Sequence, residues 1–248
     1  MAQFMNYVKT DFYKFYHSQI VKIHLIIPII TVICFLSYYT ISPWSELKKI
    51  MTYIQVISIA FPLVISIIVN MIYEQEEEAG FQYLLGIANK RYWVHFSKLI
   101  SMLTLGFIST LITILGFGII FYLMGNNSIE IDIYFKESLI VFGSNILLYI
   151  MQYLAVFYLG KGASIGIGII GSIISALMLT GIGDSIWMIL PWGYSIRLSS
   201  YFILDNLNIL NPKEPIIESI MLMVIFIIIF LFLQVIFSYN WEGKRENY

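Results

Sequence analysis

The chain is a series of long apolar runs separated by short polar stretches. A helix that crosses a bilayer needs about 20 consecutive, mostly apolar residues. Six runs reach that length, and each is bounded by charged or turn-forming residues. Their approximate bounds are 20–42, 50–73, 98–124, 138–160, 163–182 and 218–240. The pattern therefore predicts an all-α membrane protein with six transmembrane helices in one domain, residues 1–248.

The first 19 residues have a different, amphipathic pattern. Apolar residues recur at helical spacing, and charged residues take positions between them. The apolar positions are Phe4, Val8, Phe12 and Phe15, and the polar ones are Lys9, Asp11 and Lys14. This pattern predicts a helix that lies in the membrane interface. A frayed, solvated tail is the alternative.

Residues 184–204 are apolar enough to suggest a seventh span, but their interior does not suit one. Pro191, Gly193 and Arg197 lie at the centre, and Trp187 and Trp192 belong to a residue type that gathers at membrane surfaces. A seventh span would also put the two termini on opposite sides. We therefore predict a re-entrant or interfacial helix pair on the outer face, where protein can shield irregular backbone.

Composition agrees with a membrane protein and disfavours several other classes. Of the 248 residues, 59% are hydrophobic and 12% are charged, and the mean hydropathy is +0.84. The net charge of −1 provides no basic field that would attract nucleic acid. Cys34 is the only cysteine, so an internal disulfide is impossible and a thiol-based metal site is not expected.

The positive-inside rule predicts the orientation. With the N-terminus inside, the cytoplasmic side receives Lys9, Lys14, Lys22, Lys90, Arg91, Lys98, Lys161, Lys244 and Arg245. The outer side receives Lys48, Lys49, Lys136, Arg197 and Lys213. The larger share of cations is inside, so we expect a multi-pass protein of the cell membrane with both termini in the cytoplasm.

The sequence carries no strong catalytic motif. His17, His24 and His95 have no partner at metal-ligand spacing, and no GxxxxGK[ST] phosphate loop occurs. The pair Glu77-Glu78 is similar to the paired glutamates of CAAX-type intramembrane proteases, but Tyr83 replaces the arginine expected five residues later. No carboxylate lies in the middle of a predicted span, which disfavours an ion-coupled transporter. We therefore expect no enzyme, and energy supplied from another chain.

Polar residues inside the spans form two stripes. One comprises Gln55, Ser58, Ser66 and Asn70 of the second span, and the other comprises Asn145, Tyr149 and Gln152 of the fourth. Such stripes could line a translocation path. Uncharged polar side chains also hydrogen-bond neighbouring helices in hydrocarbon, and we favour this packing interpretation.

The fifth predicted span contains small residues at a spacing of four. The pairs are Gly162-xxx-Gly166 and Gly171-xxx-Ser175. Small residues let two helix backbones approach closely. The contact could lie within the chain or at a seam with a partner permease, and the sequence does not separate the two.

Segment 74–97, between the second and third spans, is densely charged. Four glutamates come first, and Gly80 and an apolar helical face follow. The residues singled out are Glu74, Glu76, Glu77, Glu78, Gly80, Phe81, Leu84, Leu85 and Arg91. Acidic residues suit the start of a helix and basic residues its end, so we predict a cytoplasmic helix that begins at the glutamates. It could dock on a partner or remain a solvated loop helix.

Together these features resemble the permeases of type-2 ABC exporters. The shared features are six spans, an N-terminal interfacial helix, a glutamate-rich helix after span two and an outer re-entrant segment before span six. Within that group, residues 22–39, 61–63, 73–85 and 191–198 are similar to lantibiotic-immunity permeases of the MutG/EpiG type. One departure is that residues 86–89, Gly-Ile-Ala-Asn, stand where many type-2 permeases have a proline.

The resemblance implies that the residues singled out in 74–97 couple the chain to an ABC ATPase. Two copies of that ATPase would bind ATP and Mg²⁺, and this chain would hold no cofactor of its own. A second, E-type permease subunit would complete the membrane unit, and a lantibiotic would be expelled from the membrane. The alternatives are a type-2 permease for a lipid, drug or ion, and an ATPase-independent membrane protein that sequesters the peptide.

The predicted outer surface is acidic on balance. Glu130, Asp132 and Glu137 lie at the start of the fourth span and could attract a cationic peptide. The positive-inside bias by itself also leaves the outer loops acidic. We favour this second explanation.

Overall fold

The computed structural model describes residues 2–86, 91–209 and 216–243, which fold into helices and turns. The α-helices are α1 (Ala2–Tyr16), α2 (Gln19–Ile41), α3 (Glu46–Glu78), α4 (Gln82–Gly86), α5 (Arg91–Leu123), α6 (Ile131–Leu159), α7 (Lys161–Leu177), α8 (Tyr194–Asn206) and α9 (Ile216–Asn240). Two 3-10 turns, η1 (Gly183–Ser185) and η2 (Pro191–Gly193), lie between α7 and α8. For these ranges the prediction of an all-α protein is confirmed.

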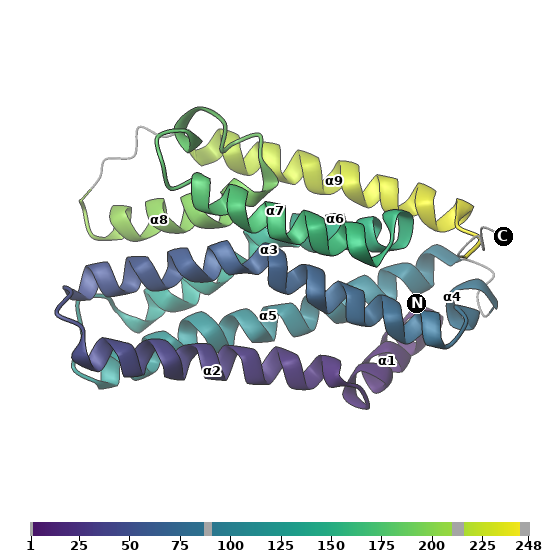
Figure 1. The fold of residues 1–248 in the computed structure, drawn as a ribbon, viewed down its shortest axis with the longest axis horizontal. Helices are drawn as coiled ribbons and strands as arrows, with labels where there is room; N and C mark the ends of the chain where they lie inside the picture. Colours follow the sequence, from purple (N-terminus) through teal and green to yellow (C-terminus); the bar gives the residue numbers. More distant parts are fainter. Residues whose placement is uncertain (1, 87–90, 210–215, 244–248) are drawn as a thin grey trace.

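The long helices lie side by side along the long axis of the molecule (Figure 1). One end carries α1, α4 and the C-terminal end of α9, and we call it the terminal end. The opposite end carries the connections 42–45 and 124–130, and we call it the loop end. The first and last described helices therefore reach the same end of the bundle.

Five helices are long and apolar enough to cross a membrane: α2, α3, α5, α6 and α9. The chain is therefore a multi-pass membrane protein by the length and composition of its helices. α7 is shorter, because its 17 residues span about 25 Å against a hydrocarbon core of about 30 Å. The predicted sixth span, 163–182, is thus a shorter apolar helix followed by turns and α8.

α7 and α8 pack against successive parts of α3. Ser164 of α7 bonds to Asn70 near the terminal end of α3, whereas Ser195 of α8 bonds to Ser58, farther toward the loop end. The turns η1 and η2 connect the two helices. Residues 184–204 therefore contain one α-helix inside the bundle, and the predicted helix pair on the outer face is not formed.

Small residues bring α7 close to α3. The buried positions of α7 are Ser164, Gly168, Gly171 and Ser175. A Cβ atom added to Gly168 would lie 2.6 Å from Ser66 Cβ and 3.0 Å from the Pro62 carbonyl oxygen, so glycine is required for this approach. Gly162 and Gly166 lie on the other side of α7, where an added Cβ would meet nothing within 4 Å. The two predicted pairs thus face different surroundings.

α1 forms the predicted amphipathic helix and packs on the terminal end of α5. Its buried positions are Tyr7, Asp11 and Phe15, spaced four residues apart, while Phe12 is half-buried beside them. The prediction that Asp11 stays on a solvated face is wrong. Asp11 is buried because α5 supplies a partner for its charge, as described below.

Candidate functional site

The centre of the candidate site is a buried ion network at the terminal end. Lys98 of α5 is fully buried, and its Nζ lies 2.9 Å from Asp11 Oδ1 and 2.8 Å from Glu76 Oε1. The side chains of Asp11 and Glu76 are also fully buried. The three residues come from α1, α3 and α5, so one lysine joins three helices that are far apart in the sequence.

Further polar groups extend this network. Lys14 of α1 places its Nζ 2.9 Å from Glu76 Oε1 and is about a quarter exposed, at 26%. Ser97 Oγ donates a hydrogen bond to Asp11 Oδ2, and Gln75 Nε2 donates one to the Lys14 carbonyl oxygen over 3.2 Å. The network therefore contains two carboxylates and two ammonium groups, and its formal charge is balanced.

Charge balance makes this burial tolerable. Taking an ion out of water costs several kcal/mol, and only a well-formed partner offsets that cost. Removing one partner from a buried pair costs about 3–5 kcal/mol. The ends of α1, α3 and α5 are therefore tied together and should move as one unit.

Tyr83 of α4 covers the network. Its ring centroid lies 3.9 Å from Lys14 Nζ and 5.6 Å from Lys98 Nζ, so the ring faces both cations. Burial, together with the negative charges of Asp11 and Glu76, raises the pKa of Tyr83 well above its ordinary value. The phenol therefore stays neutral, and α4 is held against the network by cation–π contacts.

The glutamates end α3 instead of beginning a new helix. Glu74–Glu78 form the last turn of α3, which is continuous from Glu46. Gly80 (φ +62°) and Phe81 (φ +54°) then take left-handed conformations. The Gly80 amide donates to the Glu77 carbonyl and the Phe81 amide to the Glu76 carbonyl, at 2.9 and 2.8 Å, which is a Schellman helix end.

The predicted helix start is therefore wrong, for an electrostatic reason. A helix C-terminus disfavours acidic residues by a few tenths to about 1 kcal/mol. Tertiary pairing outweighs that cost, because Glu76 meets Lys98 and Lys14, and Glu77 lies 3.0 Å from Lys161 Nζ. The rule applied to the sequence was local, whereas these cations are remote in the chain.

The structure divides the predicted coupling residues into buried and exposed groups. Glu76, Phe81 and Leu84 are buried, Glu77 and Leu85 are half-buried, and Glu74, Glu78 and Gly80 are exposed. Glu74 also lies 3.4 Å from Lys161 Nζ. Arg91, which begins α5, donates to the Trp241 carbonyl oxygen over 3.0 Å. Ala88, part of the predicted apolar face, lies outside the described residues.

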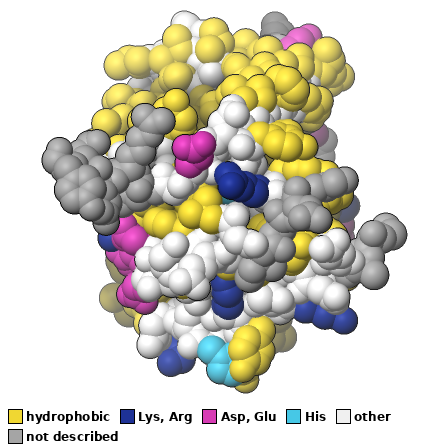
Figure 2. All heavy atoms as spheres, turned by 90° about the vertical axis from the view of Figure 1, so that its right-hand side faces the viewer, with side chains coloured by type: hydrophobic (Ala, Val, Ile, Leu, Met, Phe, Trp, Pro, Cys, Tyr) yellow, Lys and Arg dark blue, Asp and Glu magenta, His cyan; other side chains and the backbone are white. Residues whose placement is uncertain are grey.

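Figure 2 looks onto the terminal end. Acidic and basic side chains gather there in separate small groups among uncharged polar atoms, and apolar side chains cover the upper part of the view. Of the predicted coupling residues, Glu74 and Glu78 are the exposed acids at this end. A partner at the terminal end would therefore meet these two carboxylates, not all four glutamates.

The two polar stripes lie between helices and join them. Asn70 Nδ2 donates to Ser164 Oγ over 3.0 Å, and the amide of Gln152 lies 2.9 Å from the same hydroxyl. This set links α3, α7 and α6. In this structure the members of the stripes contact protein, and they line no open path among the described residues.

A second polar set has the same role nearer the loop end. Asn145 Nδ2 donates to Ser195 Oγ over 3.3 Å, and Ser195 Oγ donates to Ser58 Oγ over 3.0 Å, which links α6, α8 and α3. Tyr149 is buried against Gly106 of α5, whose added Cβ would lie 2.5 Å from the phenol oxygen. Ser66 is buried beside Gly168, and Gln55 is half-buried.

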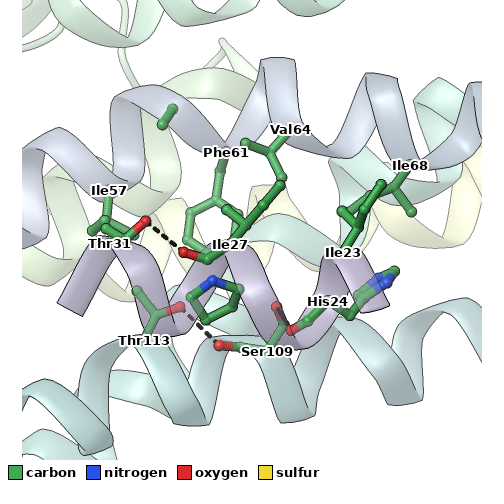
Figure 3. A pocket seen from close by; sticks show the side chains of 12 residues that line it. Ile23, His24, Ile27, Thr31, Ile57, Phe61, Val64, Ile68, Ser109 and Thr113 are labelled. Carbon is green, nitrogen blue, oxygen red and sulfur yellow. Dashed lines mark hydrogen bonds between the residues drawn. The ribbon is translucent and has the colours of Figure 1, made fainter. Parts of the chain in front are cut away.

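A small groove lies between α2, α3 and α5 (Figure 3). Apolar side chains such as Ile27, Phe61 and Val64 form most of its wall. Ser109 Oγ, at its edge, donates to the His24 carbonyl oxygen over 2.9 Å. The groove holds about 70 Å³, far below the roughly 300–1,000 Å³ of ordinary ligand pockets. It does not suit a peptide substrate.

The three predicted outer acids do not share one surface. Glu130 and Asp132 are exposed, and Asp132 Oδ2 lies 2.8 Å from Lys136 Nζ one turn along α6. Glu137, by contrast, is 1% exposed. The prediction that Glu137 belongs to an exposed acidic rim is therefore wrong, because the helical period turns it toward α8 and the bundle interior.

The sequence analysis missed Asp11, Lys14 and Lys98 as members of a site. Lys98 was treated as the boundary of a span and Asp11 as part of a solvated face. The spacing of Tyr7, Asp11 and Phe15 is a usable signal, since residues four apart share one face of a helix. A carboxylate in an otherwise aromatic stripe indicates that a buried cation must face it.

No protein-family model, curated protein or solved structure matches this chain. Inference about its function therefore depends on its own residues, above all the ion network and the exposed acids at the end of α3. The resemblance of its motifs to exporter permeases adds a family to which those features can be compared.

Proposed function

We propose that the chain is the permease subunit of an ABC exporter that expels a lantibiotic from the membrane. In this proposal the terminal end faces the cytoplasm and docks a separate ATPase subunit. The observation that carries the proposal is the acidic end of α3, exposed at Glu74 and Glu78 and joined to α1 and α5 by the buried ion network. Such an end is both accessible to a partner and rigidly connected to the membrane helices.

The geometry offers a route for force from the terminal end to the loop end. α3 is one helix of 33 residues, so a displacement at Glu78 is carried along about 50 Å. α1 and α5 would follow, because parting Lys98 from either carboxylate costs several kcal/mol. α7 would follow through its glycine contact with α3. ATP hydrolysis in trans fits the absence of a phosphate-loop motif from the sequence.

Three further parts of the proposal come from the motif resemblance. These are two copies of the ATPase, with ATP and Mg²⁺ bound there, a second E-type permease subunit, and a lantibiotic as substrate. The exposed face of α7 that carries Gly162 and Gly166 is available for the second permease. The subunit would reside in the cell membrane with both termini in the cytoplasm.

Charge reversal of the two exposed acids should uncouple the subunit. In the double variant Glu74→Lys and Glu78→Lys, we expect at least a tenfold weaker association with the ATPase and loss of protection against the peptide. The free energy of unfolding should stay within about 0.5 kcal/mol of the parent, because both positions are at the surface. Co-purification from mild detergent and peptide sensitivity of the cells measure the two effects.

Asp132→Lys is the matched control, since Asp132 is an exposed acid at the opposite end of the bundle. Its association with the ATPase should equal that of the parent. Normal association and normal protection in the double variant would refute docking at the end of α3. Protection that persists in a strain without any ATPase partner would instead support a sequestering immunity protein.

A further inference from the structure

A cavity of about 420 Å³ lies between α6, α8 and α9. This volume falls within the range of about 300–1,000 Å³ that is typical of small-ligand sites. Most of its wall is apolar, with Ile140, Leu198, Phe202, Ile220 and Met223 among its members. The cavity is thus about six times larger than the groove between α2, α3 and α5.

Two polar side chains belong to the wall. Ser144 of α6 is 1% exposed, and its Oγ has no hydrogen-bond partner among the described residues. Asp205, near the end of α8, is exposed and also lines the cavity. A buried hydroxyl without a partner in an apolar cavity is a group that a ligand can satisfy.

A buried carboxylate stands beside the cavity. Glu137 precedes Ile140 by three residues and Ser144 by seven, so all three share one face of α6. Neither carboxyl oxygen of Glu137 has a hydrogen-bond partner among the described residues. Ser199 of α8 is a polar neighbour of Glu137, and its own Oγ also has no partner.

The cations nearest in sequence on these two helices are paired elsewhere. Lys136 pairs with Asp132, and Arg197 pairs with Asp184. Within the described part of the chain no ion pair includes Glu137. A buried carboxylate without a counter-charge is unfavourable. Glu137 therefore calls for a cation that this chain does not supply.

We propose that this cavity binds the alkylammonium end of a cationic amphiphile. The ammonium group pairs with Glu137 and donates its remaining hydrogens to the hydroxyls of Ser144 and Ser199. The hydrocarbon part fills the apolar wall, and Asp205 attracts the cation as it enters. The site belongs to the subunit alone and does not depend on an ATPase, so it goes beyond the exporter proposal.

Photolabelling of the full-length subunit in lipid nanodiscs tests this site. The probe is a decylammonium that carries a diazirine, and the matched neutral probe is the corresponding decanol. We expect the ammonium probe to label residues 139–144, 198–205 and 216–223, at least tenfold more than the alcohol does at equal concentration. Equal labelling by both probes would overturn the proposal, because the apolar wall alone would then explain binding.

Three variants separate charge, cavity volume and folding. Glu137→Gln should reduce labelling by the ammonium probe at least tenfold, and Asp132→Asn, one turn away and exposed, should leave it unchanged. Gly143→Leu should block both probes while the charge is kept, because Gly143 lines the cavity and an added Cβ meets nothing within 4 Å. Unfolding transitions of each variant verify the fold. Undiminished labelling in a folded Glu137→Gln or Gly143→Leu variant would contradict the assignment.

Discussion

Replacing Lys98 with methionine should lower the free energy of unfolding of the subunit by about 3–5 kcal/mol. The substitution keeps a long side chain in place but removes the cation that neutralises Asp11 and Glu76. Two buried carboxylates would then share one half-exposed partner, Lys14, which contacts only Glu76. Unfolding by sodium dodecyl sulfate in mixed micelles measures the change.

The control for this prediction is Lys161→Met. Lys161 also pairs with two glutamates, Glu74 and Glu77, but its side chain is 42% exposed. Exposed ion pairs contribute about 0–1 kcal/mol, so this variant should unfold nearly as the parent does. A loss of equal size in both variants would show that burial of the network is not the cause.

A compensated variant makes the test of the network sharper. In Asp11→Asn, Glu76→Gln and Lys98→Met combined, the three buried charges disappear together. We expect this variant to recover a large part of the stability that Lys98→Met loses, since no uncompensated buried charge remains. If the triple variant is as unstable as Lys98→Met, packing of the lysine side chain and not its charge holds the helices.

Substitution of Gly168 by leucine should be the second most damaging change. An added Cβ would lie 2.6 Å from Ser66 Cβ and 3.0 Å from the Pro62 carbonyl oxygen, and α3 backbone cannot give way easily. Forcing extra carbon atoms into a packed interface costs about 1–3 kcal/mol, and this site should lie at the upper end. The same detergent titration measures the loss.

Gly166→Leu is the matched control on the same helix. An added Cβ at Gly166 meets nothing within 4 Å, so the isolated subunit should tolerate leucine there. Co-purification with a second permease gives an additional readout. If Gly166→Leu abolishes that association while the subunit stays folded, the outer face of α7 is the seam with the partner. Equal destabilisation by both leucines would contradict the distinction between the two faces of α7.

The positions of the long helices could be predicted from the sequence with small errors. The run 20–42 corresponds to α2 (Gln19–Ile41), and the run 218–240 corresponds to α9 (Ile216–Asn240). These assignments succeed because backbone groups in hydrocarbon must be satisfied within the helix, so an apolar run of sufficient length becomes helical. The amphipathic period of α1 was equally readable, for its pattern also lies within one segment.

The candidate site could be predicted only in part. The sequence drew attention to the glutamates, but it could not show that Glu76 is buried whereas Glu78 is exposed. It also placed Glu137 on the outer surface, although the side chain is buried. Both errors have one cause: the environment of a charged residue depends on which helices pack around it, and residues remote in the chain supply those neighbours.

Hydrophobic run length and helical period, both local properties, determined that this is an all-helical chain with several helices able to cross a membrane. The tertiary structure decided where α3 ends, which face of α7 meets α3, and which charges are buried. Glu76 meets Lys98 and Lys14 across 22 and 62 residues of sequence. Local helix rules disfavour acids at a C-terminus by up to about 1 kcal/mol, whereas breaking a buried ion pair costs several times more. The larger energy comes from remote residues, and therefore only the folded arrangement fixes the site.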